Sequence, residues 1–287
     1  MSLPVQIGAL LPQLTARLQA AGCGEARLDA RLLIAEATGL APMAVFSRPE
    51  TPLTPEQHTR LEQLAVRRCA RQPMAQILGR RDFWTLTFRV TEDTLDPRPD
   101  SETLIEAILE QFPERTAPLR VLDLGVGTGC LLLTTLHEYP AATGMGIDRS
   151  LAALAVARDN AQTLGLAARV RFLQGDWLSG VDGVFDLVIS NPPYIPAAEI
   201  ASLAPEVATW EPRLALDGGQ DGLDCYRHLA ATVGPVLAPG GLVVFEVGAG
   251  QAPDVNGLLA AAGFTLLPSR RDLGGIERCV LARWPHP

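Results

Sequence analysis

The N-terminal part of the chain spaces its apolar residues as a helix does. From Val5 onward they recur at steps of three and four residues, in the order Ile7, Leu10, Leu11, Leu14 and Leu18. Two such runs each end at a glycine, which is common where helices stop. Thr54, Pro55 and Gln57 supply a capping hydroxyl, a first-turn proline and a capping-box glutamine, so another helix should begin there. We predict a small helical bundle over residues 1–75.

The period changes to two between Arg80 and Val90, where apolar side chains alternate with Thr and Arg. Such alternation indicates a strand or a hairpin. Prolines at positions 97 and 99 then interrupt the pattern. We therefore predict a β-hairpin linker over residues 76–98 and a second domain over residues 99–287.

Strand-like apolar runs alternate with helical segments through the second domain. The predicted strands lie near residues 119–124, 143–148, 169–173, 185–190, 241–247, 264–268 and 277–283. Alternation of this kind predicts an α/β fold: a doubly wound, Rossmann-like, seven-stranded sheet with helices on both faces. Ligands of such sheets bind at the carboxyl ends of the strands, so candidate functional residues should follow the strands directly.

The first predicted strand runs into a glycine-rich loop. The loop consists of Gly125, Val126, Gly127, Thr128 and Gly129, and an apolar helix follows from Cys130. Glycines let the backbone turn sharply and approach a ligand closely, and a helix N-terminus presents free N–H groups. A plain strand-to-helix turn would use the same glycines, so this signal is weak alone.

Asp148 ends the next predicted strand, about 20 residues after the glycines, where a carboxylate can accept both hydroxyls of a ribose. Together the two signals predict a nucleoside cofactor. The G-x-G-x-G spacing, with Asp123 just ahead of it, departs from the G-x-G-x-x-G pattern of NAD sites and favours S-adenosylmethionine. Asp176 and Trp177 close the third strand and could flank an adenine, or could be a loop cap and a packed aromatic residue.

A proline-rich stretch, Asn191-Pro192-Pro193-Tyr194, ends the fourth predicted strand. Prolines fix φ and lack an N–H, and a residue before proline is extended, so the loop should be stiff and rich in acceptors. The Asn191 side-chain oxygen and a neighbouring carbonyl could hold the two N–H groups of a planar amino group. Such a nucleophile needs no general base, and Tyr194 could lie against its plane. We predict catalytic roles for Asn191, Pro192 and Tyr194, and substrate contacts for the whole stretch, Pro193 included.

Charge and cysteine usage narrow the range of partners. The 287 residues carry a net charge of −8, which disfavours stable binding to DNA. Residues 1–75 hold eight arginines against six acidic residues, a balance of +2, so the remainder carries −10. Five scattered cysteines suggest no metal site and no disulfide framework, and no signal peptide or membrane span is evident. We expect a monomeric cytoplasmic protein without a metal.

With these motifs the chain resembles the peptide-chain release factor glutamine methyltransferases, the HemK/PrmC family, over nearly its whole length. Besides the helical bundle and the hairpin, the shared segments are residues 97–102, 125–129, 148, 191–194, 217–223, 245–248 and 271–278. Asn-Pro-Pro-Tyr alone also occurs in adenine-N6 and other amino methyltransferases. The combination of segments is far more specific.

The resemblance implies methylation of the side-chain amide nitrogen, N5, of the glutamine in the Gly-Gly-Gln motif of class 1 translation release factors. S-adenosylmethionine would be the methyl donor and S-adenosylhomocysteine the product. Residues 125–129, Asp148, Trp177 and Asn191 would contact the cofactor, and residues 191–194 the glutamine. Docking of the release factor on residues 1–75 is a further hypothesis.

Three positions depart from the family pattern. Asp96 stands where an aliphatic residue is usual, Ser101 replaces Thr, and Val126 replaces Thr or Cys, which leaves the packing of the 91–102 loop open. The internal Gly218-Gly219-Gln220 imitates the substrate motif, and we interpret it as coincidence. Two alternatives remain: an adenine-N6 methyltransferase acting on DNA or RNA, and a non-catalytic binding module.

Overall fold

The computed structural model describes residues 6–285, so Val5, where the predicted helical pattern begins, lies outside the described residues. The chain forms two compact units. Residues up to 79 make the first together with a short return segment, 204–210, and residues 80–203 and 211 onward make the second. Nothing in the sequence pattern points to the return segment.

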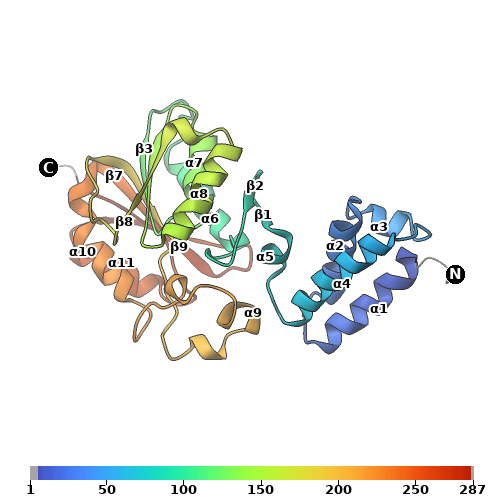
Figure 1. Cartoon of the computed structure of the whole chain (residues 1–287). Coiled ribbons are helices and arrows are strands. Elements are labelled where there is room, and N and C mark those ends of the chain that lie inside the picture. The colour runs from blue at the N-terminus through green and yellow to red at the C-terminus, as the bar shows by residue number, and fades with distance from the viewer. Residues whose placement is uncertain (1–5, 286–287) are drawn as a thin grey trace. The chain divides into compact units, whose positions relative to one another are not determined.

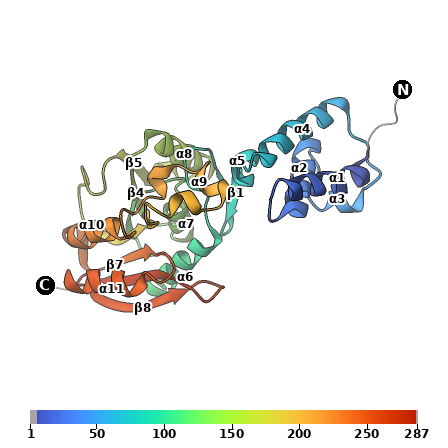
Figure 2. The ribbon, with the colours of Figure 1, turned by 90° about the horizontal axis from the view of Figure 1, so that it is seen from below.

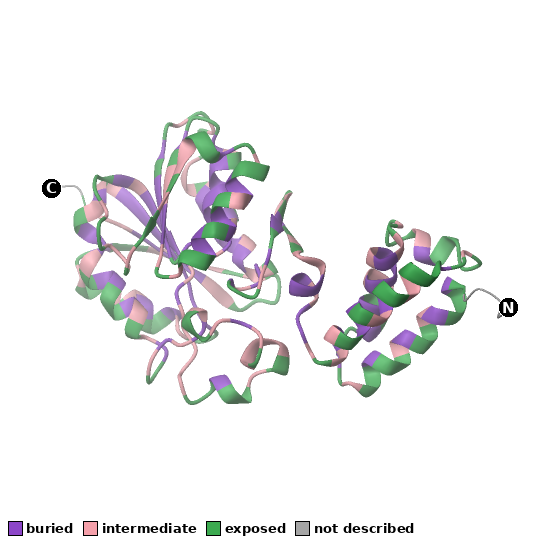
Figure 3. Ribbon diagram, in the orientation of Figure 1, coloured by how far each residue is buried: buried purple, intermediate pink, exposed green. Residues whose placement is uncertain are grey.

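The first unit is helical, as expected (Figure 1). Its helices are α1 (Ile7–Ala20), α2 (Ala26–Thr38), α3 (Ala44–Ser47), α4 (Pro55–Cys69) and α5 (Met74–Leu78), with α9 (Pro205–Ala208) in the return segment. The predicted capping box is present: Gln57 N donates to Thr54 Oγ1, and the Thr54 N–H donates to the Gln57 side chain. Apolar faces of α1, α2 and α4 form one core and leave their polar faces in solvent, as Figure 3 shows by colour.

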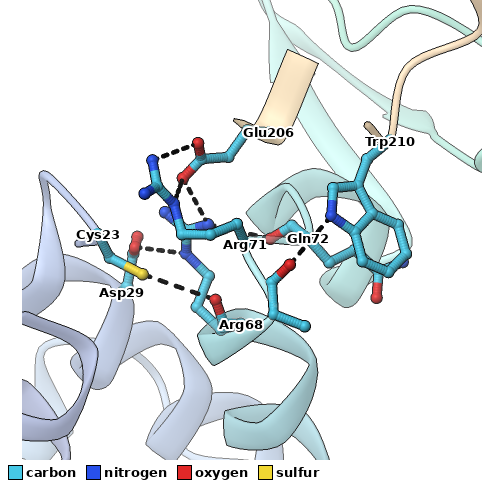
Figure 4. Close-up of polar contacts among 8 residues, drawn as sticks. Cys23, Asp29, Arg68, Arg71, Gln72, Glu206 and Trp210 are labelled. Carbon is cyan, nitrogen blue, oxygen red and sulfur yellow. Dashed lines mark hydrogen bonds and ion pairs between the residues drawn. The ribbon is translucent and has the colours of Figure 1, made fainter. Parts of the chain in front are cut away.

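Glu206 attaches the return segment to the rest of the first unit (Figure 4). Its carboxylate accepts hydrogen bonds from Arg71 Nε and Nη2 at 2.7 and 2.6 Å, and from Arg68 Nη1 at 2.9 Å. The Trp210 indole donates to the Ala70 carbonyl at 3.1 Å. These contacts join residues more than 130 positions apart in the chain.

The charge of Arg68 is buried between two carboxylates. Its side chain is 7% exposed, and its Nε donates to Asp29 Oδ2 at 2.8 Å. Burial raises the pKa of Asp29 despite this bond. Burial alone would also raise the pKa of Glu206, but the hydrogen bonds from Arg71 and Arg68 outweigh it and lower that pKa. Removal of one partner would leave a poorly compensated charge, so the cluster restrains both the helices and the return segment.

The second unit begins with the expected hairpin, β1 (Arg80–Phe83) paired antiparallel to β2 (Leu86–Arg89). Trp84 stands in its turn with φ of 56°. A sheet of seven strands follows within the described residues, and it confirms every strand predicted after residue 99. The strands are β3 (Arg120–Leu124), β4 (Thr143–Asp148), β5 (Val170–Gln174), β6 (Phe185–Ser190), β7 (Leu237–Glu246), β8 (Thr265–Arg271) and β9 (Glu277–Arg283).

Helices cover both faces of this sheet (Figures 1 and 2). One face packs on α6 (Glu102–Gln111), α7 (Cys130–Glu138) and α8 (Leu151–Thr163), and the other on α10 (Asp224–Thr232) and α11 (Ala252–Ala261). Alternate residues of a strand supply the two cores: Val121 faces the first group of helices and Leu122 the second. Both are fully buried, which explains why the strands are continuous apolar runs.

The order of the strands places the candidate site. The sheet runs β5-β4-β3-β6-β7-β9-β8, with β9 antiparallel to both of its neighbours and the other pairs parallel. Chain direction across the sheet reverses between β3 and β6, so the loops after these two strands diverge and leave a crevice at their carboxyl ends. Over residues 6–285, the helices are all too short or too polar to cross a bilayer.

Candidate functional site

A pocket opens at this crevice and is built entirely from the second unit. The glycine-rich loop after β3, the end of β4 and the loop after β6 all contribute to its wall. Of the residues singled out in the sequence, those that line the pocket are Gly125, Val126, Gly127, Thr128, Asp148, Trp177, Asn191 and Pro193. Gly129, Pro192 and Tyr194 lie behind this lining.

The glycine loop depends on backbone conformations that other residues rarely adopt. Gly125, Gly127 and Gly129 have φ of 79°, 53° and 82°. A side chain on Gly129 would also approach Leu133 of α7 to 3.0 Å. The glycines therefore let the chain turn from β3 into α7 while its backbone borders the pocket.

Asp148 holds this loop in place. Its Oδ2 accepts a hydrogen bond from Gly127 N at 2.9 Å, and its Oδ1 accepts one from Ser150 N at 2.9 Å. The side chain is half-buried at the pocket wall. One carboxylate therefore connects the loop after β3 to the loop after β4.

Asp123, the fourth residue of β3, is a pocket residue with an unsatisfied oxygen. It is 1% exposed, and its Oδ1 has no hydrogen-bond partner among the described residues. Burial, reinforced by the charge of Asp148, raises the pKa of Asp123 to about 8. A buried acceptor without a donor is costly, and a cationic ligand group would relieve that cost. In the sequence analysis, Asp123 served only to favour S-adenosylmethionine over NAD, and no binding role was assigned to it.

Trp177 and Asp176 differ in placement. Trp177 is half-buried, lines the pocket and has φ of 53°, a strained conformation for a bulky residue. Asp176 is exposed, lies 3.6 Å from Arg149 Nε and is not part of the pocket lining. Only the tryptophan is placed to border a ligand there.

The Asn191–Tyr194 loop extends from β6 to the pocket edge. Asn191 is half-buried in the lining, and Pro192 is buried behind it. The Tyr194 ring packs against the core beside α10 and α11, and its hydroxyl lies 3.5 Å from Glu246 Oε1. Burial raises the pKa of Tyr194 to about 12, so the phenol stays neutral.

Gly218, the first glycine of the internal Gly-Gly pair, lies against the Asn191–Tyr194 loop. Ile195 N donates to the Leu216 carbonyl and Gly218 N to the Ile195 carbonyl, which pairs the two loops side by side. A Cβ on Gly218 would lie 2.8 Å from Tyr194 Cα and 2.9 Å from the Pro193 oxygen. Gly218 is therefore required for packing against the Asn191–Tyr194 loop.

Asp96 is also accounted for by the fold. It is 7% exposed and lies near two guanidinium groups, 3.7 Å from Arg81 Nε and 3.8 Å from Arg98 Nη1. Burial raises the pKa of Asp96, and the two arginines oppose that rise. Arg98 in turn donates to Glu211 at 2.7 Å. Charged residues thus pack the 91–102 loop at a position where the family usually has an aliphatic residue.

Comparison with known proteins gives two family matches, the PrmC N-terminal domain over residues 9–79 and the methyltransferase small domain over residues 96–208. The release factor glutamine methyltransferase of Rhodospirillum rubrum is 50% identical over 277 residues, 96% of this chain and 85% of the relative. The protein of the same name from Cereibacter sphaeroides is 50% identical over 269 residues, 94% and 95% of the two chains. This chain belongs to the release factor glutamine methyltransferase family.

A solved structure, the release factor-specific protein-(glutamine-N5) methyltransferase of Alicyclobacillus acidocaldarius, is 27% identical, with 67% of this chain and 94% of that chain covered. Its TM-score is 0.41, so the family assignment depends on the sequence relatives. Family membership and the seven-stranded fold confirm the resemblance inferred from the motifs. The methyltransferase domain matched by the family model includes the glycine loop, Asp148 and the Asn191–Tyr194 loop.

Proposed function

We propose that this chain transfers a methyl group from S-adenosylmethionine to N5 of the glutamine in the Gly-Gly-Gln motif of class 1 release factors. The observation that carries the proposal is the shared pocket: Asn191 borders the same cavity as the glycine loop and Asp148. An acceptor for an amide N–H thus borders the same cavity as a glycine loop of the kind that binds nucleoside cofactors. Translation release factors act in the cytoplasm, so we propose this location, with the enzyme acting as a monomer and without stable DNA binding.

The residues around the pocket fit this cofactor. The unsatisfied Asp123 Oδ1 would accept from the ammonium of its amino-acid part, and Asp148 from the ribose hydroxyls. Trp177 would lie against the adenine, and residues 125–129 would pass along the cofactor without side-chain interference. When bound, the cofactor supplies an electrophilic methyl group on a sulfonium.

The protein would assist the attack by orientation and by fixed dipoles. An amide nitrogen is a poor nucleophile because its lone pair is delocalised into the carbonyl. Asn191 Oδ1 would accept one N–H of the glutamine side chain and hold the nitrogen toward the methyl group. Positive charge grows on this nitrogen during transfer, so a fixed acceptor stabilises the transition state more than the ground state. The extra proton would leave after the transfer, which requires no general base beforehand.

A labelling experiment tests the proposed reaction. The enzyme is incubated with methyl-labelled S-adenosylmethionine and either a release factor or its Gly-Gly-Ala variant. We expect stoichiometric labelling of the first and none of the second. Equal labelling of the two factors, or preferential labelling of added DNA or RNA, would contradict the proposal.

We further propose that the helical N-terminal domain docks the release factor, since it lacks the strong negative charge of the rest of the chain. The wild type should then prefer a full-length release factor over a short Gly-Gly-Gln peptide in kcat/KM. A full-length variant in which Arg27 and Arg48, two exposed arginines of this domain, are replaced by Glu should lose this preference. It should still methylate the peptide at the wild-type rate, which controls for damage to the pocket. Retention of the preference by this variant would refute docking through the positive charge of this domain.

A further inference from the structure

A buried carboxylate, Glu246, lies behind the Asn191–Tyr194 loop and reaches both of its ends. Glu246 is the last residue of β7 and is 1% exposed. It accepts a hydrogen bond from the Ser101 hydroxyl, and Asn191 Nδ2 lies 3.5 Å from Ser101 Oγ. The other carboxylate oxygen of Glu246 lies 3.5 Å from the Tyr194 hydroxyl. Ser101 and Asn191 line the pocket, whereas Glu246 is set behind them.

The single proton of the Ser101 hydroxyl determines how Asn191 can be oriented. Once Ser101 donates this proton to Glu246, its lone pairs can only accept. The Asn191 amide then turns its NH2 toward Ser101, because its oxygen would meet another oxygen with no proton between them. Oδ1 is thereby directed away from Ser101. The carboxylate selects one of two orientations that an asparagine side chain could otherwise adopt equally well.

We propose that Glu246 is a positioning residue for the methyl transfer: through Ser101 it presents the Asn191 oxygen to the substrate amide, and it restrains Tyr194 directly. This inference rests on the proposed function, since the orientation matters only if Asn191 accepts from the substrate. Both 3.5 Å contacts are long for hydrogen bonds. Long contacts of this kind in catalytic sites commonly shorten when substrate binds.

Protonation of Glu246 would remove its preference for one orientation of the Asn191 amide. A neutral Glu246 can donate to Ser101, whose own proton then faces Asn191 and suits the amide oxygen instead. Burial raises the pKa of Glu246 to about 7, and the Ser101 bond, the Arg278 charge and the amide of Asn191 oppose the rise. With saturating cofactor, kcat should therefore increase with pH and be half-maximal near pH 7.

The tyrosines and cysteines near Glu246 do not share this titration. The titratable and charged groups that face it are Asp100, Cys130, Tyr194, Tyr226, Arg278 and Cys279. Burial raises the pKa of both tyrosines and both cysteines, so all four stay neutral near pH 7. Asp100 lies 3.3 Å from Arg278 Nη2 in an ion pair.

Four variants test the inference. In Glu246→Gln, kcat on a release factor should fall about 10- to 100-fold, with the cofactor Kd unchanged and the pH dependence near 7 absent. Ser101→Ala should lose as much, and Ser101→Thr, which keeps the hydroxyl, should recover most of the rate. Tyr226→Phe is the matched control, because its hydroxyl donates to the Glu246 backbone oxygen at 2.7 Å and leaves the carboxylate alone. It should keep the wild-type kcat.

The outcomes separate this inference from the proposed function. A wild type that methylates no release factor would overturn both. If the wild type is active and Glu246→Gln keeps its kcat or its pH profile, only the positioning role is wrong. A loss in Tyr226→Phe as large as that in Glu246→Gln would also overturn it, because the effect would then come from damage to β7.

Discussion

Binding of S-adenosylmethionine at pH 7 should release close to one proton from Asp123. In the free protein this buried residue has a pKa of about 8, so about 90% of the molecules carry the proton at pH 7. An ammonium beside the unsatisfied oxygen would lower that pKa by roughly 2–3, since an opposite charge at contact distance has an effect of this size. Asp123 should therefore release about 0.9 proton at pH 7. The net release should be about 0.8, because roughly a tenth of the free cofactor takes up a proton at its α-amino group when it binds.

The same reasoning fixes the sign and size of the pH effect on affinity. The cofactor favours the ionised form of Asp123, so its Kd should rise about tenfold from pH 7 to pH 6, equivalent to about 1.4 kcal/mol. Below pH 7 the α-amino group of the ligand is itself already charged, since its ordinary pKa is about 8. The change in this range therefore reports on the protein.

Calorimetric titration in phosphate and in imidazole buffer measures the proton release directly, because the two buffers differ in ionisation enthalpy. Asp123→Asn, which resembles the protonated residue in shape, should fold normally and release none. Methylthioadenosine keeps the nucleoside but lacks the ammonium, so it should also release none. Equal heats in both buffers would refute the reasoning, and release that persists in Asp123→Asn would place the proton elsewhere.

Three further predictions concern the packing of Gly218, the ion pairs of Glu206 and the stacking role of Trp177. Gly218→Ala should lower kcat at least tenfold by displacing the Asn191–Tyr194 loop. Gly257→Ala is its control, because the added Cβ meets nothing within 4 Å, and it should leave kcat unchanged. Similar kcat values for the two variants would contradict the packing role of Gly218. Glu206→Gln should lower the free energy of unfolding of the first unit by about 2 kcal/mol, because two guanidinium groups lose their shared carboxylate. Denaturant unfolding measures this change. Trp177→Ala should raise the cofactor Kd by roughly tenfold in calorimetry, and an unchanged Kd would exclude the stacking role.

Local sequence pattern was sufficient to predict most of the fold. Buried strands such as β3 and β6 are continuous apolar runs because both of their faces are covered, and the capping box at Thr54 depends on residues three apart. The glycine loop and Asn191 could be recognised because each directly follows a strand. Features that depend on nearby residues in the chain are readable in this way.

The network behind Asn191 could not be predicted in the same way. Ser101 and Glu246 are 145 residues apart and meet only because β6 and β7 are neighbours and the start of α6 lies at their ends. Glu246 also ends a strand, and an acidic residue directly after the apolar run of β7 was the one available signal. Gly218 was noticed in the sequence only as part of the internal Gly-Gly-Gln motif. Its packing role could not be predicted, because its need for a small residue arises from the backbone of another loop.

The chain passes between its two units three times, after residues 79, 203 and 210. The N-terminal domain is therefore not a detachable module, although a family model matches it as one continuous block. A chimera that joins the helices of one relative to the catalytic part of another at residue 79 would separate Arg68 and Arg71 from their inherited carboxylate. A successful graft would have to carry residues 204–210 as well, and substitutions at position 206 should be accepted in evolution only together with changes in these arginines.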